Sequence, residues 1–486
     1  MPQMVDTPTI PPVPTGLYVA GAWHDADDGR TFPVTDPATD QVVATVADAG
    51  PDEARRALDA AVAAQPSWAA TSPRERSELL RAVFDTLVAQ REELAQLIAT
   101  EMGKSRNESR AEVTYASEFF RWYSEEAVRI GGRTAQAPHA NGRIETYARP
   151  VGPSLFITPW NFPLAMLARK VAPALAAGCT TITKPAPETP LSANRLAQIF
   201  DELDTPHGVV NVLATSRARA LVEPLLADPR LRKLSFTGST EVGRELLRSA
   251  AGNVLRTSME LGGNAPFLVL EDADVEAAAD AAAIAKMRNI GQSCVAANRF
   301  LVHESVAEPF AHALAVRLQR PPLAPGWDGD DVVGALIDRA ACERIEALVR
   351  DACDRGAKAL IGGDAVDGPG SFYAPTVLYP CPVDAEILRQ EIFGPVAPIT
   401  AVASEDEAIE RANDTPFGLI AYVHGRDVDR CRRLAERLET GMVAVNRGVI
   451  SEPAAPFGGA KQSGLGREGG AEGLEAYVET QYVGLP

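Results

Sequence analysis

The stretch SLFITPWNFPLAMLARKVAPALAAGCTTITK, residues 154–184, decides the fold of this chain. Two short β-rich runs, SLFIT and TTITK, flank a longer run whose apolar residues follow helical spacing. A strand, a helix and a strand in this order form a unit whose two strands are parallel. The alternation continues through GVVNVL, KLSFT and TSMEL, with helical runs between them, to residue 260. We therefore predict an α/β domain with a parallel sheet covered by helices.

The sequence on either side of this stretch predicts three further parts. Residues 51–122 repeat Ala and Leu at spacings of three and four, which is typical of amphipathic covering helices. A second strand-and-helix series runs from 265 to about 445 and predicts another α/β domain. Residues 131–151 and 475–483 alternate apolar and polar side chains, so we expect edge strands there that another subunit can pair with.

Composition limits the classes of function. The 486 residues include 47 Lys and Arg against 65 Asp and Glu, a net charge of −18, and 46% of them are hydrophobic. These values are ordinary for a soluble globular protein of several domains and exclude a disordered or fibrous chain. The negative charge repels phosphate backbones, so we expect no nucleic-acid partner, and an anionic substrate requires a locally basic pocket.

Other features of the sequence favour a cytoplasmic protein without a metal site or a membrane span. Six cysteines without a CxxC pair favour a reducing compartment, and six scattered histidines lack metal-binding spacing. Residues 1–6 lack the basic start of an export signal. The longest apolar stretch, 171–183, is shorter than the roughly 18–20 residues that span a bilayer.

Three positions could carry chemistry. Cys294, in the turn GQSC at 291–294, is either a thiolate nucleophile or a small buried apolar residue. Glu260 ends a predicted strand before LGG and is either a general base or a surface carboxylate. The turn FTGSTEVG at 236–243 opens a predicted helix whose N-terminus could meet a phosphate, although it departs from both GxGxxG and the P-loop.

Taken together, the motifs of this chain are far more specific. PWNFP at 159–163, KP at 184–185, FTGSTEVG at 236–243, ELGG at 260–263, GQSC at 291–294 and EIFGP at 391–395 follow one another in this order. From about residue 17 to 483, the chain resembles the NAD(P)-dependent aldehyde dehydrogenase superfamily. The resemblance implies an α/β fold with a Rossmann-like coenzyme domain (1–130 and 152–262), a catalytic domain (263–455) and a small β oligomerisation arm (131–151 and 470–486). It also implies a homodimer or homotetramer.

The resemblance further implies a role for each matching catalytic position. Cys294 matches the nucleophile that forms a thiohemiacetal with the aldehyde, and Asn161 matches the side chain that, with the Cys294 N–H, stabilises the oxyanion. After hydride transfer to the nicotinamide, Glu260 would activate the water that hydrolyses the thioester. The matching coenzyme contacts are Thr158, Pro159, Trp160, Lys184, Gly238, Ser239, Glu391 and Phe393.

The substrate class follows from two arginines. Arg169 stands eight residues after Asn161, and Arg288 stands six residues before Cys294. Two guanidiniums near the nucleophile of an acidic protein favour a carboxylate-bearing aldehyde, although each Arg could instead pair with a structural carboxylate. The surrounding segments 160–180, 286–300 and 455–469 look like those of succinate-semialdehyde dehydrogenases. In that subfamily the matches to Arg169, Arg288 and Ser463 bind the substrate carboxylate.

The sequence allows three alternatives to the oxidation of succinate semialdehyde. Glutarate semialdehyde is a plausible second substrate, because one methylene discriminates by only about 1–3 kcal/mol. A CoA-acylating semialdehyde dehydrogenase is a different reaction class, which Glu260 argues against because such enzymes generally lack that base. A binding protein that keeps the fold without catalysis would have no need of Cys294, Glu260, Asn161 and Lys184 together.

Four departures from the family pattern qualify the resemblance. Ala296 replaces the second cysteine of many related enzymes, so we expect no regulatory disulfide there. Pro187 stands where many NAD-using members have Glu, with Glu188 displaced by one, and Ser216 or Arg217 could reach a 2′-phosphate. The coenzyme is therefore NAD or NADP, with NADP favoured. Met287 replaces a common aromatic residue.

Overall fold

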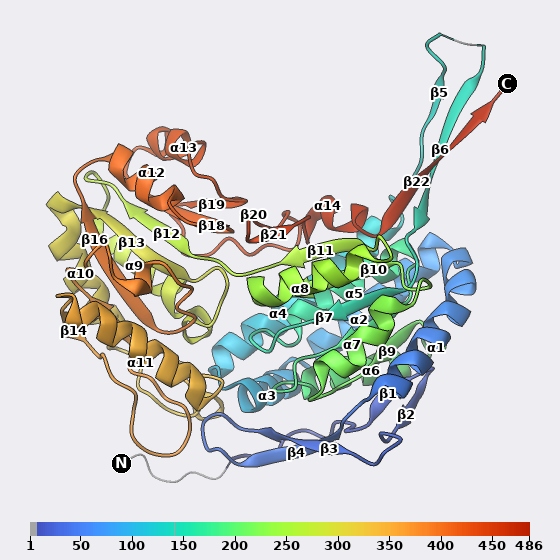
Figure 1. Ribbon diagram of the computed structural model, residues 1–486, viewed down its shortest axis with the longest axis horizontal. Coiled ribbons are helices and arrows are strands. Elements are labelled where there is room, and N and C mark those ends of the chain that lie inside the picture. The colour runs from blue at the N-terminus through green and yellow to red at the C-terminus, as the bar shows by residue number, and fades with distance from the viewer. Residues whose placement is uncertain (1–6, 140) are drawn as a thin grey trace.

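The computed structural model describes residues 7–139 and 141–486. It has two α/β lobes and a three-stranded arm that projects away from them (Figure 1). Residues 1–6, where the sequence predicts no export signal, lie outside the described part of the chain.

The first lobe is built on an eight-stranded sheet in the order β2-β1-β9-β8-β7-β10-β11-β21. Its five central strands, from β9 to β11, are parallel. Among these five, β7 comes first in the sequence. β8 and β9 follow on one side of it and β10 and β11 on the other, so the strand order reverses between β7 and β10. The strands are β1 (Leu17–Val19), β2 (Ala22–His24), β7 (Ser154–Ile157), β8 (Thr181–Lys184), β9 (Val210–Val212), β10 (Lys233–Thr237), β11 (Arg256–Glu260) and β21 (Gly464–Leu465).

Helices cover both faces of this sheet, because successive side chains of a strand point to opposite faces. Phe156 packs in the core formed with α2, α4, α5 and α6, whereas Leu155 and Ile157 pack in the core formed with α1 and α7. All residues of α5 are buried, which explains its nearly unbroken apolar sequence. The helices are α1 (Pro51–Ala70), α2 (Pro73–Ala89), α3 (Arg91–Met102), α4 (Arg106–Ala127), α5 (Ala165–Ala177), α6 (Leu191–Glu202), α7 (Ala218–Ala227) and α8 (Thr240–Ala251).

The second lobe has a seven-stranded sheet in the order β14-β15-β16-β13-β12-β18-β19. All neighbours except β14 and β15 are parallel. Its strands are β12 (Ala265–Val269), β13 (Ala297–His303), β14 (Ala359–Ile361), β15 (Thr376–Leu378), β16 (Val396–Val402), β18 (Ile420–His424) and β19 (Met442–Val445). Its helices are α9 (Val275–Met287), α10 (Glu304–Leu318), α11 (Arg339–Asp354), α12 (Glu405–Asn413) and α13 (Val428–Ala435).

Short strands and turns connect these parts. They are β3 (Thr31–Thr35), β4 (Val42–Ala47), β17 (Phe417–Gly418), β20 (Ala460–Lys461), α14 (Gly470–Glu475) and the 3-10 turns Arg288–Gly291, Gly326–Asp328 and Glu386–Leu388. Because β21 adds to the first sheet, the chain after the second lobe returns to the first.

The projecting arm consists of β5 (Thr134–Gln136), β6 (Arg143–Pro150) and β22 (Val478–Leu485). β22 pairs antiparallel with β6 from Val478 opposite Pro150 to Leu485 opposite Arg143. The two peripheral segments that the sequence marks as edge strands therefore pair with each other, although Glu475 still belongs to α14.

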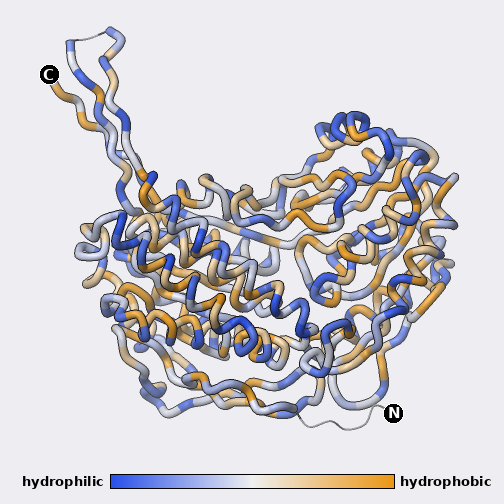
Figure 2. The backbone as a smooth tube through the Cα atoms, turned by 180° about the vertical axis from the view of Figure 1, so that it is seen from behind, coloured by the Kyte–Doolittle hydropathy of each residue, from blue (hydrophilic) through white to orange (hydrophobic). Residues whose placement is uncertain are grey.

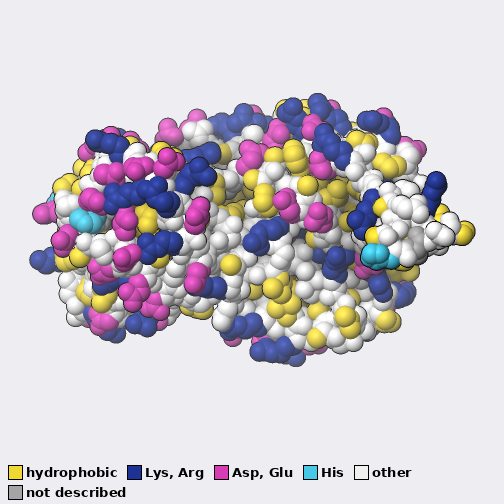
Figure 3. Space-filling view, turned by 90° about the horizontal axis from the view of Figure 1, so that it is seen from above, with side chains coloured by type: hydrophobic (Ala, Val, Ile, Leu, Met, Phe, Trp, Pro, Cys, Tyr) yellow, Lys and Arg dark blue, Asp and Glu magenta, His cyan; other side chains and the backbone are white. Residues whose placement is uncertain are grey.

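The distribution of side chains follows this architecture. Figure 2 shows apolar stretches along the strands inside both lobes, and in Figure 3 acidic and basic side chains are interspersed over the face seen from above. No helix among residues 7–139 and 141–486 has the length and apolar character needed to cross a bilayer.

Candidate active site

The strand register brings the predicted coenzyme residues to one edge of the first sheet. Ile157 lies opposite both Lys184 and Phe236, and Thr237 lies opposite Glu260. The residues that end or follow β7, β8, β10 and β11 therefore meet at the carboxyl edge, where the strand order reverses. In open α/β sheets this is the place where ligands bind.

Lys184 is the buried cation of this edge. Burial lowers its pKa to about 8, and the nearby carboxylate of Glu188 acts in the opposite direction. Burial in turn raises the pKa of Glu188. Glu188, displaced by one position from the usual place of the carboxylate, thus still lies close enough to Lys184 to interact with it.

Contacts place other predicted coenzyme residues near the same strand ends. Ser239 caps the N-terminus of α8 by accepting a hydrogen bond from Val242 N–H at 3.3 Å. The rings of Trp160 and Phe393 meet edge to face at 5.5 Å, and Glu391 Oε1 accepts from Gly263 N–H at 3.2 Å. A helix N-terminus suits a pyrophosphate, and a lysine and a carboxylate suit ribose hydroxyls, so this donor set fits a dinucleotide. Of the remaining predicted contacts, Thr158 and Pro159 directly follow β7, and Gly238 directly follows β10.

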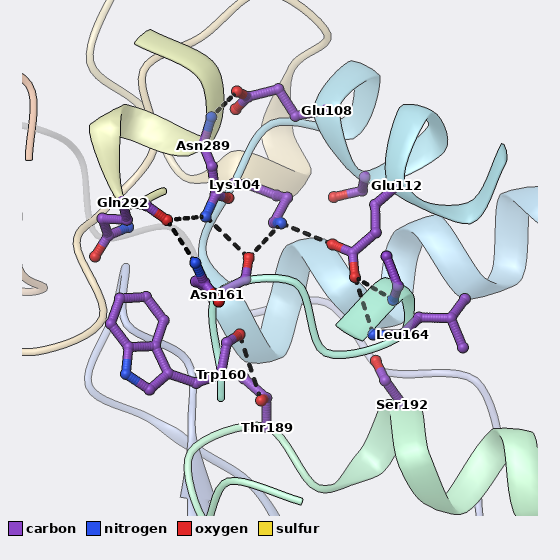
Figure 4. A network of polar contacts seen from close by, with 12 residues as sticks. Lys104, Glu108, Glu112, Trp160, Asn161, Leu164, Thr189, Ser192, Asn289 and Gln292 are labelled. Carbon is purple, nitrogen blue, oxygen red and sulfur yellow. Dashed lines mark hydrogen bonds and ion pairs between the residues drawn. The ribbon is translucent and has the colours of Figure 1, made fainter. Parts of the chain in front are cut away.

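Asn161 lies in a dense polar network at the end of β7 (Figure 4). Its Nδ2 donates to Gln292 C=O at 3.0 Å, and its own C=O accepts from Lys104 Nζ at 2.7 Å and Asn289 Nδ2 at 2.9 Å. An amide nitrogen carries two hydrogens, so one remains for an oxyanion. Asn161 and the turn that contains Cys294 are therefore directly linked.

Cys294 follows a strained turn. Asn289 and Ile290 adopt φ angles of +57° and +60°, a left-handed conformation that is unusual for a β-branched residue such as Ile. Gly263 approaches the turn so closely that a Cβ there would lie 2.4 Å from the Cys294 carbonyl oxygen. Burial raises the pKa of the Cys294 thiol to about 12, against the opposing effect of Arg169.

Glu260 belongs to a buried cluster of charges. Glu468 forms ion pairs with both Arg169 and Lys170, and Lys170 Nζ also donates to Ser235 Oγ at 2.9 Å. The Glu260 carboxylate has no hydrogen-bond partner among the described residues. Burial, followed by the negative charge of Glu468, raises its pKa well above the usual value. A buried carboxyl group with a raised pKa is suited to act as a general base near neutral pH.

Of the two predicted substrate arginines, Arg288 lines a small cavity, and Arg169 lies against one residue of its wall. Arg288 Nη1 donates to Ser451 Oγ at 2.6 Å, and both residues line the cavity together with Ser293 and Phe457. Arg169 stacks on Phe457, with its guanidinium carbon 4.3 Å from the ring centroid. Its Nε faces Glu468, and among the described residues its two terminal nitrogens have no hydrogen-bond partner. Arg169 thus has a structural partner in Glu468 and also lies near the buried Tyr115 hydroxyl.

Two predicted residues have hydroxyl groups that already form hydrogen bonds within the protein. Ser463 is completely buried, donates to Gly262 C=O at 2.7 Å and accepts from Gly418 N–H at 2.9 Å, so backbone groups on both sides occupy its hydroxyl. A substrate-binding role for Ser463 therefore has no support in the structure. Ser216 donates from its hydroxyl to Asp48 at 2.7 Å and from its N–H at 2.9 Å, so a carboxylate already holds it.

Sequence reasoning missed several residues of the site. Ser451 lies in a loop with no motif of its own, and only its contact with Arg288 reveals it. Lys170 and Glu468 form an ion pair although they are 298 residues apart in the sequence. Lys104, which contacts Asn161, belongs to none of the family motifs. Among residues 7–139 and 141–486, no three His, Cys, Asp or Glu side chains gather as a metal site.

Comparisons with known proteins agree on one family. The model of the aldehyde dehydrogenase family matches residues 23–483. A succinate-semialdehyde dehydrogenase of Paenarthrobacter nicotinovorans is 54% identical over 444 residues, 91% of this chain and 99% of that protein. A glutarate-semialdehyde dehydrogenase of Pseudomonas putida is 44% identical, with 96% of each chain covered. A crystal structure described as an E. coli NADP-dependent enzyme has a TM-score of 0.96 at 42% identity, covering 97% of this chain and 98% of that one.

Proposed function

Because the chain belongs to the aldehyde dehydrogenase family, we propose that it oxidises succinate semialdehyde to succinate with NAD or NADP. The observation that carries the substrate is Arg288, which with Ser451 lines a cavity beside the Cys294 turn, together with Arg169, which stacks on Phe457 in the wall of that cavity. The name of the Paenarthrobacter relative supports the same substrate. The name of the Pseudomonas relative supports glutarate semialdehyde as a second one.

Cys294 begins the reaction. Its sulfur, as the thiolate, bonds to the aldehyde carbon, and the carbonyl oxygen takes up the negative charge. The free hydrogen of Asn161 Nδ2 and the Cys294 N–H stabilise this oxyanion. The positive charges of Arg169 and Arg288 favour the thiolate, whereas burial opposes it. When bound, NAD(P)⁺ would supply the acceptor for the hydride of the thiohemiacetal carbon, which then becomes the carbonyl carbon of a thioester on Cys294.

Glu260 completes the reaction. In its ionised form it takes a proton from a water molecule, whose oxygen bonds to the thioester carbon while the C–S bond breaks. Because neither of its oxygens has a partner among the described residues, the carboxylate is available for that water. Lys170, in contact with Glu468, lies in the same charge cluster and lowers the cost of ionising Glu260. This chemistry needs no CoA.

Arg288, Ser451 and Arg169 recognise the distal carboxylate of the substrate. Guanidinium groups offer paired N–H donors that match a carboxylate, and the Ser451 hydroxyl can add a second kind of donor. In this proposal Ser451 has the role that the resemblance implies for Ser463. A short dicarboxylic semialdehyde fits this arrangement because one end is the aldehyde at Cys294 and the other end is the anion.

For the coenzyme we propose NADP over NAD. Lys184, Trp160, Ser239, Glu391 and Phe393 would hold either form. Pro187 is uncharged and stands where many NAD-using members have a glutamate that repels the 2′-phosphate of NADP. The E. coli structure described as an NADP-dependent enzyme supports the same choice. The Asp48 carboxylate would have to release Ser216 before that serine could contact a 2′-phosphate.

We also propose that the arm formed by β5, β6 and β22 joins subunits into a dimer or tetramer. Within the described residues no strand pairs with the outer edge of β22 or of β5, and unpaired edges of this length favour strand addition. All six cysteines are free thiols, which supports a reducing cytoplasm as the location. Light scattering on the purified chain measures the assembly, and a monomer contradicts it.

One assay tests the activity. The absorbance of reduced coenzyme is followed with NAD or NADP and with succinate semialdehyde, glutarate semialdehyde, butanal and benzaldehyde, in the absence of CoA. We expect the highest kcat/KM with succinate semialdehyde and NADP. A preference for butanal removes the carboxylate role of the arginines, and activity that requires CoA contradicts hydrolysis by Glu260.

A further inference from the structure

A buried ion pair lies behind the active site. Lys104, in the turn between α3 and α4, and Glu112, on α4, are both completely buried, and their Nζ and Oε2 atoms are 2.7 Å apart. Desolvation largely offsets the attraction between two such charges, so a buried pair of this kind adds little to stability. Its position beside Asn161 indicates another role.

Both members of the pair contact the backbone that carries Asn161 (Figure 4). Lys104 Nζ donates to Asn161 C=O at 2.7 Å. Glu112 Oε1 accepts from the N–H groups of Leu164 and Ala165, at 2.9 and 3.1 Å, where α5 begins. The pair therefore fixes the chain on both sides of the turn from 161 to 165. The Lys104 backbone is itself held by close packing, because a Cβ on Gly326 would lie 2.1 Å from its carbonyl oxygen.

The same carbonyl connects the pair to the Cys294 turn. Asn289 Nδ2 donates both to Asn161 C=O at 2.9 Å and to Gln292 C=O at 2.8 Å. The Asn289 N–H in turn donates to Glu108 of α4, which holds the left-handed turn in place. Without the ammonium group of Lys104, the Asn161 carbonyl would keep one donor, and the Asn161 amide could shift relative to Cys294.

We propose that Lys104 and Glu112 are positioning residues of the aldehyde oxidation, which hold the Asn161 amide at the distance from Cys294 that the oxyanion requires. The inference rests on the proposed chemistry of Cys294 and Asn161, and it adds to that chemistry two residues that touch neither substrate nor coenzyme. A displacement of about 1 Å at a reacting centre costs about 100-fold in rate. Loss of the pair should therefore lower kcat much more than it changes KM.

The first test replaces both charges together, in the double variant Lys104→Met/Glu112→Gln. Met fills the space of the lysine stem, and Gln keeps an oxygen for the two N–H groups of α5, so no unpaired charge is left buried. We expect kcat to fall about 100-fold and KM to stay within about 3-fold of wild type. The control is Arg76→Met, which removes another buried cation that donates to a backbone carbonyl, that of Thr71 on the outer helices. Its kcat should equal that of wild type.

The second test asks whether the pair acts through Asn161. In an Asn161→Ala background the carbonyl is kept but the amide is gone, so the double replacement should lower kcat by less than about 3-fold further. A full 100-fold loss in that background overturns the proposal, as does a folded double variant whose kcat is within about 3-fold of wild type. If the double variant does not fold, Lys104→Arg replaces it: the larger guanidinium cannot take the place of the ammonium between Glu112 and the Asn161 carbonyl without displacing that carbonyl, so kcat should fall, and an unchanged kcat overturns the proposal.

The tests separate the two levels of inference. They use whichever aldehyde the wild-type chain oxidises best, so a wrong substrate assignment does not affect them. A wild-type chain that oxidises no aldehyde overturns the proposed function, whereas an active wild type with an unaffected double variant overturns only the positioning role.

Discussion

Arg288 Nη1 donates a hydrogen bond of 2.6 Å to Ser451 Oγ, joining two loops that are 163 residues apart in the sequence. The Arg288 guanidinium also faces the rings of Phe162 and Tyr115, at 5.1 and 5.8 Å from their centroids. A cation and a hydroxyl thus lie side by side at the cavity next to the Cys294 turn. Donors arranged in this way suit a carboxylate.

The two serines of this region provide a matched pair of variants. Ser451→Ala should raise KM for succinate semialdehyde by about 5- to 10-fold, the effect of one hydrogen bond of about 1–1.5 kcal/mol, and leave butanal unaffected. Ser463→Ala should leave KM unchanged but destabilise the fold by about 1–3 kcal/mol, because two buried backbone groups lose their partner. Steady-state kinetics and thermal unfolding measure the two effects. A raised KM in Ser463→Ala with an unchanged KM in Ser451→Ala would mean that Ser463, and not Ser451, binds the substrate.

Arg288→Met tests the charge itself. We expect kcat/KM to fall about 10- to 100-fold for succinate semialdehyde, ~1.5–3 kcal/mol for a charged hydrogen bond, and far less for butanal. Methionine keeps the apolar contact with Phe162, so the difference between the two aldehydes isolates the charge. Equal losses for both aldehydes would mean that Arg288 has a structural role only.

The thiol of Cys294 should show a steep dependence on pH. Because burial raises its pKa to about 12 in the coenzyme-free protein, the thiolate fraction should rise about tenfold per pH unit between about pH 7 and pH 10. The rate of inactivation by iodoacetamide reports this fraction. Cys294→Ala should abolish oxidation but not coenzyme binding, whereas replacing the exposed Cys353 by Ser should change neither activity nor inactivation. A plateau below pH 9 would contradict the raised pKa.

Glu260→Gln should separate the two halves of the reaction. The first turnover, which ends at the thioester, should proceed, while steady-state turnover should fall by roughly 10²–10⁴-fold because no base activates the water. In wild type, the raised pKa of Glu260 means that the carboxyl is protonated at low pH and becomes a base only as the pH rises through that pKa. Steady-state kcat should therefore increase with pH where hydrolysis is rate-limiting. Rapid-mixing absorbance distinguishes the burst of reduced coenzyme in the first turnover from later turnovers. Loss of this burst would mean that Glu260 is needed at or before hydride transfer and not only for hydrolysis.

Pro187→Glu tests the coenzyme preference. A carboxylate at this position should repel a 2′-phosphate, so kcat/KM for NADP should drop at least about tenfold relative to NAD, ~1.4 kcal/mol. Glu188→Gln is the matched control, because it removes the carboxylate beside Lys184 and should shift the ratio toward NADP. If the ratio of kcat/KM for NADP to that for NAD is unchanged in both variants, this loop does not determine the coenzyme preference.

The sequence by itself determined the order of the strands and helices and the family. Strand and helix periodicity are local properties, and the runs that end at Thr158, Lys184 and Glu260 all became parallel strands of one sheet. Once these strands are parallel, their carboxyl ends must meet, so the common edge of the predicted positions that end these strands follows from the sequence alone.

Only the tertiary structure decided which side chains meet across that edge. Ser451 and Ser463 stand in the same C-terminal segment with no local signal to tell them apart, yet packing directs one to Arg288 and surrounds the other with backbone. Lys170 and Glu468 pair over 298 residues. A hydrogen bond acts over about 3 Å, whereas the path of a loop is fixed by everything it packs against, so such contacts cannot be predicted from spacing along the chain.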